Sequence, residues 1–217
     1  MFSIYLHGPG GATGCCDEEL DEQLSTICKR HRGSGRALAF AFILYNYQHP
    51  HIKKILEDDH YWIALDHLSG EYLTVFSFHV KGAVQHPRKF ANSGRLPQRR
   101  IDPLAQANKV LEEYFSQPFT MPALLFFQVA DSELVGSYMV GLSSRTVEDA
   151  FNEITSVLKI AVNSISGVTE ENRGNAQEIF ALIKDRLLAK RIGVCFYRMV
   201  RSLTSLKELR SFLSKLH

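Results

Sequence analysis

Apolar residues along this chain alternate between strand-like runs and helix-like spacing. The continuous apolar run 37–46 has the length and the aromatic and branched residues of a fully buried central strand in a mostly parallel sheet. Shorter runs at 2–6, 122–129 and 134–140 also predict strands. The last two are expected to pair through the polar turn 130–133.

Apolar residues recur at helical spacing between these runs. Helices are predicted over 17–30, 103–115 and 146–164. The third of these begins with Thr146 followed by Asp149, which is similar to a capping box. The chain therefore predicts an α/β protein in which strands and helices alternate.

Pro50 marks the start of another helix, because its missing N–H costs nothing at the first helical position. That helix is expected to end near Asp59. Beyond it, 61–66 and 71–80 both resemble strands, separated by the turn signal Ser69-Gly70. The pattern leaves open whether 61–80 is a hairpin or one interrupted strand.

Two segments lie outside this alternation. Residues 82–103 are polar, basic and rich in Gly, Pro and Asn, which predicts a long loop. The C-terminal residues predict further helices with large apolar faces. We expect a domain over 1–164, with an insertion at about 81–103, and a helical extension over 165–217. The extension either packs on the domain or forms an interface, since both would produce the same amphipathic pattern.

Charge is unevenly distributed, although the 217 residues carry a net charge of only +2. Residues 81–100 contain basic side chains and no acidic one, so this loop is either a solvated surface or a contact to an anionic partner, protein or RNA. Nucleic acid is not favoured, because Phe90 is nearly the only aromatic residue available for stacking. The candidate contacts to an anionic partner are Arg88, Lys89, Arg95, Arg99 and Arg100.

The sequence shows neither a membrane span nor a signal peptide, and this bears on the compartment and on the redox state of the cysteines. No apolar run approaches the roughly 18 residues that a membrane span needs, and the apolar start at 1–6 has neither the length nor the basic residues of a signal peptide. The sequence therefore predicts a cytoplasmic protein with no membrane partner. In that reducing compartment we expect free thiols at the four cysteines, which are Cys15, Cys16, Cys28 and Cys195.

The order and motifs of the C-terminal half resemble those of thioredoxin. Met121-Pro122 opens an apolar strand, residues 135–141 form the next one, and a capped helix follows. In that family a cis-proline precedes the fourth strand, a hairpin follows, and a glycine-containing turn leads to the last helix. Tyr47-Gln48-His49-Pro50-His51 takes the position of the family's Trp-Cys-Gly-Pro-Cys. The resemblance covers 37–161 and, by topology only, 2–30.

This resemblance implies a thioredoxin-like mixed sheet flanked by helices, with three parallel strands and an antiparallel fourth. The basic loop and the helical extension are additions to that fold. The loop 7–16 and two further segments then lie along one rim at the carboxyl ends of the strands, where open α/β sheets bind ligands. The candidate binding residues of these two segments are Gln48, His49, Pro50, His51, Met121 and Pro122.

The departure from the family concerns its chemistry. Dithiol exchange needs a thiolate at a helix N-terminus and a second thiol to resolve the mixed disulfide. Gln48 and His51 supply neither, so we predict no catalytic residue and no dithiol–disulfide oxidoreductase activity. The sequence favours a non-redox binding or assembly module without a cofactor, whose partner is another protein or a second copy of itself.

An enzyme of oxidoreductase or peroxidase type is the alternative, using thiol or histidine chemistry on the rim. Cys15 and Cys16 precede a predicted helix, whose dipole lowers a thiol pKa, but the acidic residues that follow oppose this effect. The glycine-rich stretch 8–14 matches neither a P-loop nor G-x-G-x-x-G, so nucleotide binding is not favoured.

His49 and His51 can supply two metal ligands, but a metal site needs a third or fourth. His60, His67 and Cys15 are the further ligands the sequence offers. Nothing in the spacing brings one of them to the histidine pair, and no metal is predicted.

Overall fold

The computed structural model describes residues 1–7, 28, 30–31, 33–34, 37–81, 103–115, 117–130 and 133–190. Most of the helix predicted over 17–30 lies outside these residues, as do almost all of the basic loop and the chain beyond residue 190. Predictions for Cys15, Cys16, Cys195 and the arginines of the loop therefore stay predictions.

Five strands and five α-helices are described. The strands are β1 (Phe2–His7), β2 (Ala39–Leu44), β3 (Leu73–Lys81), β4 (Ala123–Ala130) and β5 (Glu133–Gly141). The helices are α2 (Pro50–Glu57), α3 (Asp59–Ser69), α4 (Pro103–Tyr114), α5 (Val147–Ile165) and α6 (Ala176–Ala189), with a 3-10 turn at Glu170–Asn172. Within the described part of the chain, no helix combines the length and apolar character needed to cross a membrane.

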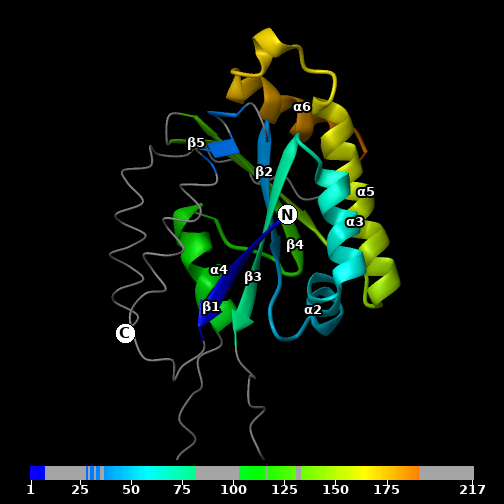
Figure 1. Ribbon diagram of the computed structural model, residues 1–217. Helices are drawn as coiled ribbons and strands as arrows, with labels where there is room; N and C mark the ends of the chain where they lie inside the picture. Colours follow the sequence, from blue (N-terminus) through cyan, green and yellow to red (C-terminus); the bar gives the residue numbers. More distant parts are fainter. Residues whose placement is uncertain are drawn as a thin grey trace, which may run out of the picture.

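The strands form one mixed sheet in the order β1-β3-β2-β4-β5. β1 and β2 both pair with β3 in parallel, whereas β4 is antiparallel to β2 and β5 is antiparallel to β4. Helices α2, α3 and α5 lie on one face and α4 lies on the other (Figure 1). The predicted α/β class, a mixed sheet flanked by helices, is therefore confirmed.

The apolar run 37–46 supplies the central strand of the sheet, β2. All six residues of β2 are buried, as expected for a strand with neighbours on both sides and helices on both faces. On the α4 face, phenylalanine rings stack across three strands, with Phe42 and Phe127 at 5.5 Å between centroids. Phe115, which follows α4, packs edge-on to Phe127 at 5.4 Å. This aromatic layer fixes α4 against the sheet.

The strand predicted over 61–66 is wrong, because these residues form the middle of α3. Asp58 caps this helix by accepting the backbone N–H groups of His60 at 2.9 Å and Tyr61 at 3.3 Å. The Ser69-Gly70 signal ends the helix instead of making a hairpin, with Gly70 in the left-handed region at φ 54°. The question of a hairpin over 61–80 is thereby settled in favour of a helix followed by β3.

The prediction for α5 is confirmed, including its start. The Thr146 hydroxyl accepts the backbone N–H of Asp149 at 3.2 Å and donates to its carboxylate at 2.8 Å. These bonds satisfy an N–H group that a helix start otherwise leaves unpaired.

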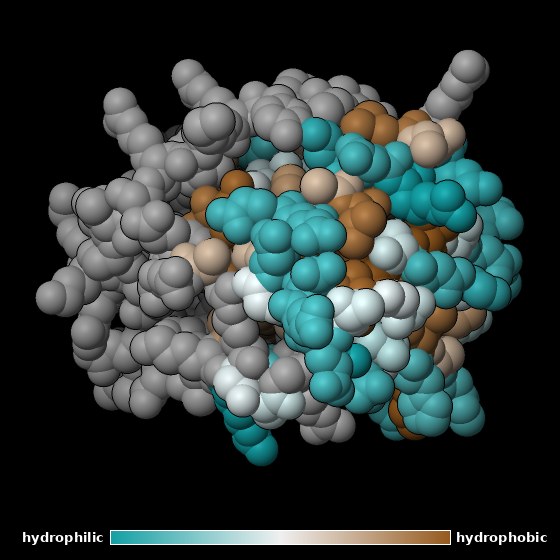
Figure 2. All heavy atoms as spheres, turned by 90° about the horizontal axis from the view of Figure 1, so that it is seen from above, coloured by the Kyte–Doolittle hydropathy of each residue, from teal (hydrophilic) through white to brown (hydrophobic). Residues whose placement is uncertain are grey.

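The described part of the C-terminal extension packs against the sheet. α6 contacts α5, β4 and β5 and buries Ile179, Ile183 and Leu187. Figure 2 views the molecule from above, the end at which α6 lies in Figure 1. Most of the described surface there is hydrophilic, with small groups of hydrophobic residues between.

Candidate binding site at the strand-end rim

One loop leaves β2 and another enters the neighbouring strand β4 at the same edge of the sheet. β1, β3 and β2 are parallel, so their carboxyl ends meet there, in the lower part of Figure 1. β4 begins at this edge, because Ala123 pairs with Leu44, the last residue of β2. The peptide bond between Met121 and Pro122, just before β4, is cis, as the resemblance implies. We call residues 45–51, 121–122 and 142–144 the strand-end rim.

Asn108 of α4 joins the two sides of this rim. Its side chain is 1% exposed, and its Nδ2 donates to the backbone oxygen of Tyr45 at 2.8 Å and contacts Sδ of Met121 at 3.2 Å. Asn108 was not among the residues predicted from the sequence. Its position four residues after Leu104 and three before Leu111 puts it on the buried face of α4, and that spacing could have revealed it.

Glu153 of α5 holds the third segment of the rim. The backbone N–H of Leu142 donates to the Pro122 oxygen at 2.8 Å. Beyond it, the backbone N–H groups of Ser143 and Ser144 each donate to the Glu153 carboxylate at 3.0 Å. Burial raises the pKa of this carboxyl, but the hydrogen bonds from the two serines outweigh burial and hold the pKa below its ordinary value.

The segment that replaces the family's dithiol is a tight loop followed by a helix start. The backbone N–H of Gln48 donates to Oδ1 of the Asn46 side chain at 2.9 Å, and that of His49 donates to the backbone oxygen of Asn46 at 3.0 Å. Pro50 takes the first position of α2, as predicted. The loop leaves the Tyr47 side chain 69% exposed, with Gln48 Nε2 donating to the Tyr47 hydroxyl at 3.2 Å.

The two rim histidines lie together, with ring centroids 6.0 Å apart at 85°. Burial, and secondly the charge of His51, lower the pKa of His49. His51 Nε2 is buried and has no hydrogen-bond partner among the described residues. Within those residues, no group of three or more His, Cys, Asp and Glu side chains could hold a metal ion. The described part of the rim therefore offers hydrogen-bonding groups and no assembled metal site.

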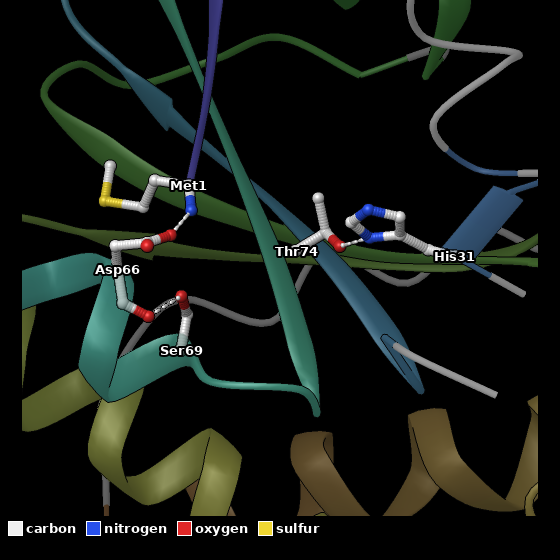
Figure 3. Close-up of polar contacts among 5 residues, drawn as sticks. All are labelled: Met1, His31, Asp66, Ser69 and Thr74. Carbon is white, nitrogen blue, oxygen red and sulfur yellow. Dashed lines mark hydrogen bonds and ion pairs between the residues drawn. The ribbon is translucent and has the colours of Figure 1, made fainter. Parts of the chain in front are cut away.

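A cavity of about 610 Å³ lies at the opposite end of the sheet, next to the amino ends of β1 and β3. His67, one of the further metal ligands considered from the sequence, lines this cavity and is not brought to the rim. Figure 3 shows contacts between Met1 and Asp66, Ser69 and Asp66, and His31 and Thr74 in this region. The Met1 amine forms an ion pair with Asp66, and His31 Nδ1 lies 2.7 Å from Thr74 Oγ1. We interpret these contacts as structural, since each of these polar groups is paired with another group of the fold.

A serine–histidine pair on β3 is also structural. His79 Nε2 lies 2.8 Å from Ser77 Oγ, a distance suited to a nucleophile and its base. Ser77 is completely buried, however, so its hydroxyl cannot meet a substrate. The His79 ring packs against Trp62 and Tyr5 at 5.6 Å each, and burial lowers its pKa while Glu57 opposes that effect. The pair therefore helps to fill the sheet face under α3.

No family model matches this chain, nor does any curated protein or solved structure. The described rim itself carries an exposed phenol, two amides, two imidazoles, two serine hydroxyls and a thioether. These groups can form hydrogen bonds and apolar contacts, and none of them is a thiol.

Proposed function

We propose that this chain is a thioredoxin-like protein that lacks dithiol chemistry and binds another protein through the strand-end rim. The strand pairing supports the fold assignment: three strands are parallel, the fourth is antiparallel, and the fifth returns as a hairpin partner of the fourth. The segment at the carboxyl end of β2 supports the loss of redox function, because Gln48 and His51 stand where the family has its cysteines.

The exposed side chain of Tyr47 carries the proposal of binding. Of the large hydrophobic side chains that are described, it has the highest exposed fraction, 69%, ahead of Ile63 at 53%. Tyrosine is enriched at protein interfaces and among the residues that dominate binding energy, because it buries a large rigid ring and keeps a polar end. Here the ring projects from a loop held by three hydrogen bonds, so little conformational entropy is lost on binding.

Histidine chemistry on the rim is the less favoured function. Nδ1 of His49 already accepts the backbone N–H of Asn46, and Nε2 of His51 is buried. A general base must reach the proton that it removes with a free lone pair, and one of these nitrogens is already engaged while the other is buried. Thiol chemistry at Cys15 and Cys16, and an anionic partner on the basic loop, concern residues outside the described ranges and stay predictions.

Affinity capture from the native host tests the proposal with matched variants. The bait is the full chain as wild type, as Tyr47→Ser, or as Ile63→Ser, a control that removes an exposed apolar side chain of α3 outside the rim. We expect one protein to be recovered equally by wild type and control, and roughly tenfold less by Tyr47→Ser. Equal recovery by all three baits, or no enriched protein, would contradict binding through the rim.

A further inference from the structure

The hydrogen bond between Asn46 and His49 depends on the protonation state of the histidine. The backbone N–H of Asn46 points to Nδ1 of His49 at 3.3 Å. A backbone N–H can only donate, so Nδ1 has to be an unprotonated acceptor and the neutral ring carries its hydrogen on Nε2. Protonation of Nδ1 would convert this acceptor into a donor and break the bond.

This bond closes the loop that presents Tyr47. It links the first and last residues of the loop, and two shorter bonds within the loop complete the closure. The His49 backbone oxygen in turn accepts the N–H of Ile52 at 3.1 Å, in the first turn of α2. His49 therefore contacts the loop that presents Tyr47 through its ring, and the first turn of α2 through its backbone oxygen.

The surroundings of His49 disfavour its charged form. In its own loop and the first turn of α2, the titratable groups are the Tyr47 phenol, the imidazole of His51 and the ammonium of Lys53. The Lys53 ammonium is paired with Glu57 at 3.6 Å. Burial and, secondly, the charge of His51 lower the pKa of His49. A charged His49 is thus better accommodated by an open, hydrated loop, which would also hydrate the unpartnered Nε2 of His51.

We infer that His49 is a pH-sensitive latch: its protonation opens the loop 46–49 and weakens partner binding at the rim. This inference rests on the proposed function, since it names the regulation of the same site. The direction of the pH effect follows because the loop is closed when the His49 ring is neutral. The loop is closed above the ordinary histidine pKa of 6.5 and opens as the pH falls below it.

Amide hydrogen exchange of the full chain, followed by NMR, tests the latch without any partner. Between about pH 7.5 and about pH 5, we expect the protection factor of the Asn46 amide to fall roughly fivefold in the wild type. His49→Asn keeps an acceptor oxygen and cannot titrate, so its protection factor should stay constant. His60→Asn changes an exposed histidine of α3 and should behave as the wild type does. A constant protection factor in the wild type, or an equal fall in His49→Asn, overturns the latch.

Capture of the rim partner at about pH 7.5 and about pH 5.5 separates this inference from the proposed function. For each bait, recovery at the lower pH is divided by that bait's own recovery at the higher pH. The latch requires this ratio to fall for the wild type and to stay near one for His49→Asn, whatever recovery the variant has at the higher pH. An equal ratio for the two baits overturns the regulation while rim binding stands. Absence of a partner at both pH values contradicts the proposed function, and the exchange measurement then still decides whether His49 opens the loop.

Discussion

Single polar side chains from two helices position the rim. Asn108 joins Tyr45 to Met121, and Glu153 fixes the two serines after β5. Each forms hydrogen bonds with backbone groups that follow the ends of strands. Without these side chains, the backbone groups would lose contact with water on folding and gain no partner in the protein. The exposed groups of the rim are therefore held by residues that a bound partner need not touch.

Glu153 gives the stability of the protein a defined response to acid. Its pKa is lower in the folded state than in the unfolded chain, so its contribution is present above about pH 4.5 and is lost as the pH falls through the folded value. We expect Glu153→Gln to lower the free energy of unfolding by about 0.5 to 1 kcal/mol at neutral pH, since the carboxylate is partly solvated. The difference from the wild type should shrink towards about pH 3.

Urea denaturation followed by circular dichroism at several pH values measures this effect. Glu171→Gln, in the exposed 3-10 turn, is the matched control and should leave both stability and its pH dependence unchanged. A Glu153→Gln difference that stays constant down to the lowest pH would rule out the role assigned to the carboxylate.

Few of the individual residues that hold the site together could be predicted from the sequence. The motif at Gln48–His51 could be found because it is contiguous and aligned with a family motif. Asn108 and Glu153 could not be found in this way, since their partners lie 63 and 10 residues away and depend on how helices dock on the sheet. Only the burial pattern of α4 carried a signal for Asn108.

Elements were predictable where the pattern extended over many residues. The buried run that became β2 and the capped start of α5 are examples. α3 was missed because Tyr61-Trp62-Ile63 combines aromatic and β-branched side chains that favour strands. The Asp58 cap, the Gly70 end and the contacts to α2 and α5 outweigh that preference.

The packing of α6 on β5 depends on one glycine. A Cβ atom at Gly136 would lie 2.7 Å from Cε1 of Phe180, closer than real Cβ contacts allow. We expect Gly136→Ala to reduce the free energy of unfolding by about 1 to 3 kcal/mol. Combining it with Phe180→Leu should recover part of this loss, with a coupling of at least about 0.5 kcal/mol.

Gly141→Ala is the control for this double-mutant cycle. Gly141 belongs to the same strand, and nothing lies within 4 Å of its added Cβ. Chemical denaturation of the four variants of the cycle gives the coupling directly. Purely additive effects of the Gly136 and Phe180 changes would show that α6 does not pack on β5 as described.

At the scale of the whole molecule, a mixed five-stranded sheet brings three short segments to one edge and leaves an aromatic side chain exposed there. The same edge carries the family resemblance at residues 47–51 and 121–122. We propose, as the central claim, that positions 48 and 51 correspond to the dithiol of a thioredoxin-like fold, and that binding has replaced redox chemistry at this site.

Insulin reduction by a double cysteine variant tests that claim most directly. In Gln48→Cys/His51→Cys, the two thiols flank Pro50 at the start of α2, the geometry that dithiol exchange needs. With dithiothreitol as reductant, we predict that this variant forms a disulfide between positions 48 and 51 and reduces insulin. The wild type and Gln48→Ser/His51→Ser should remain inactive. Insulin reduction by the wild type, or a double cysteine variant that folds but forms no such disulfide, would contradict the account.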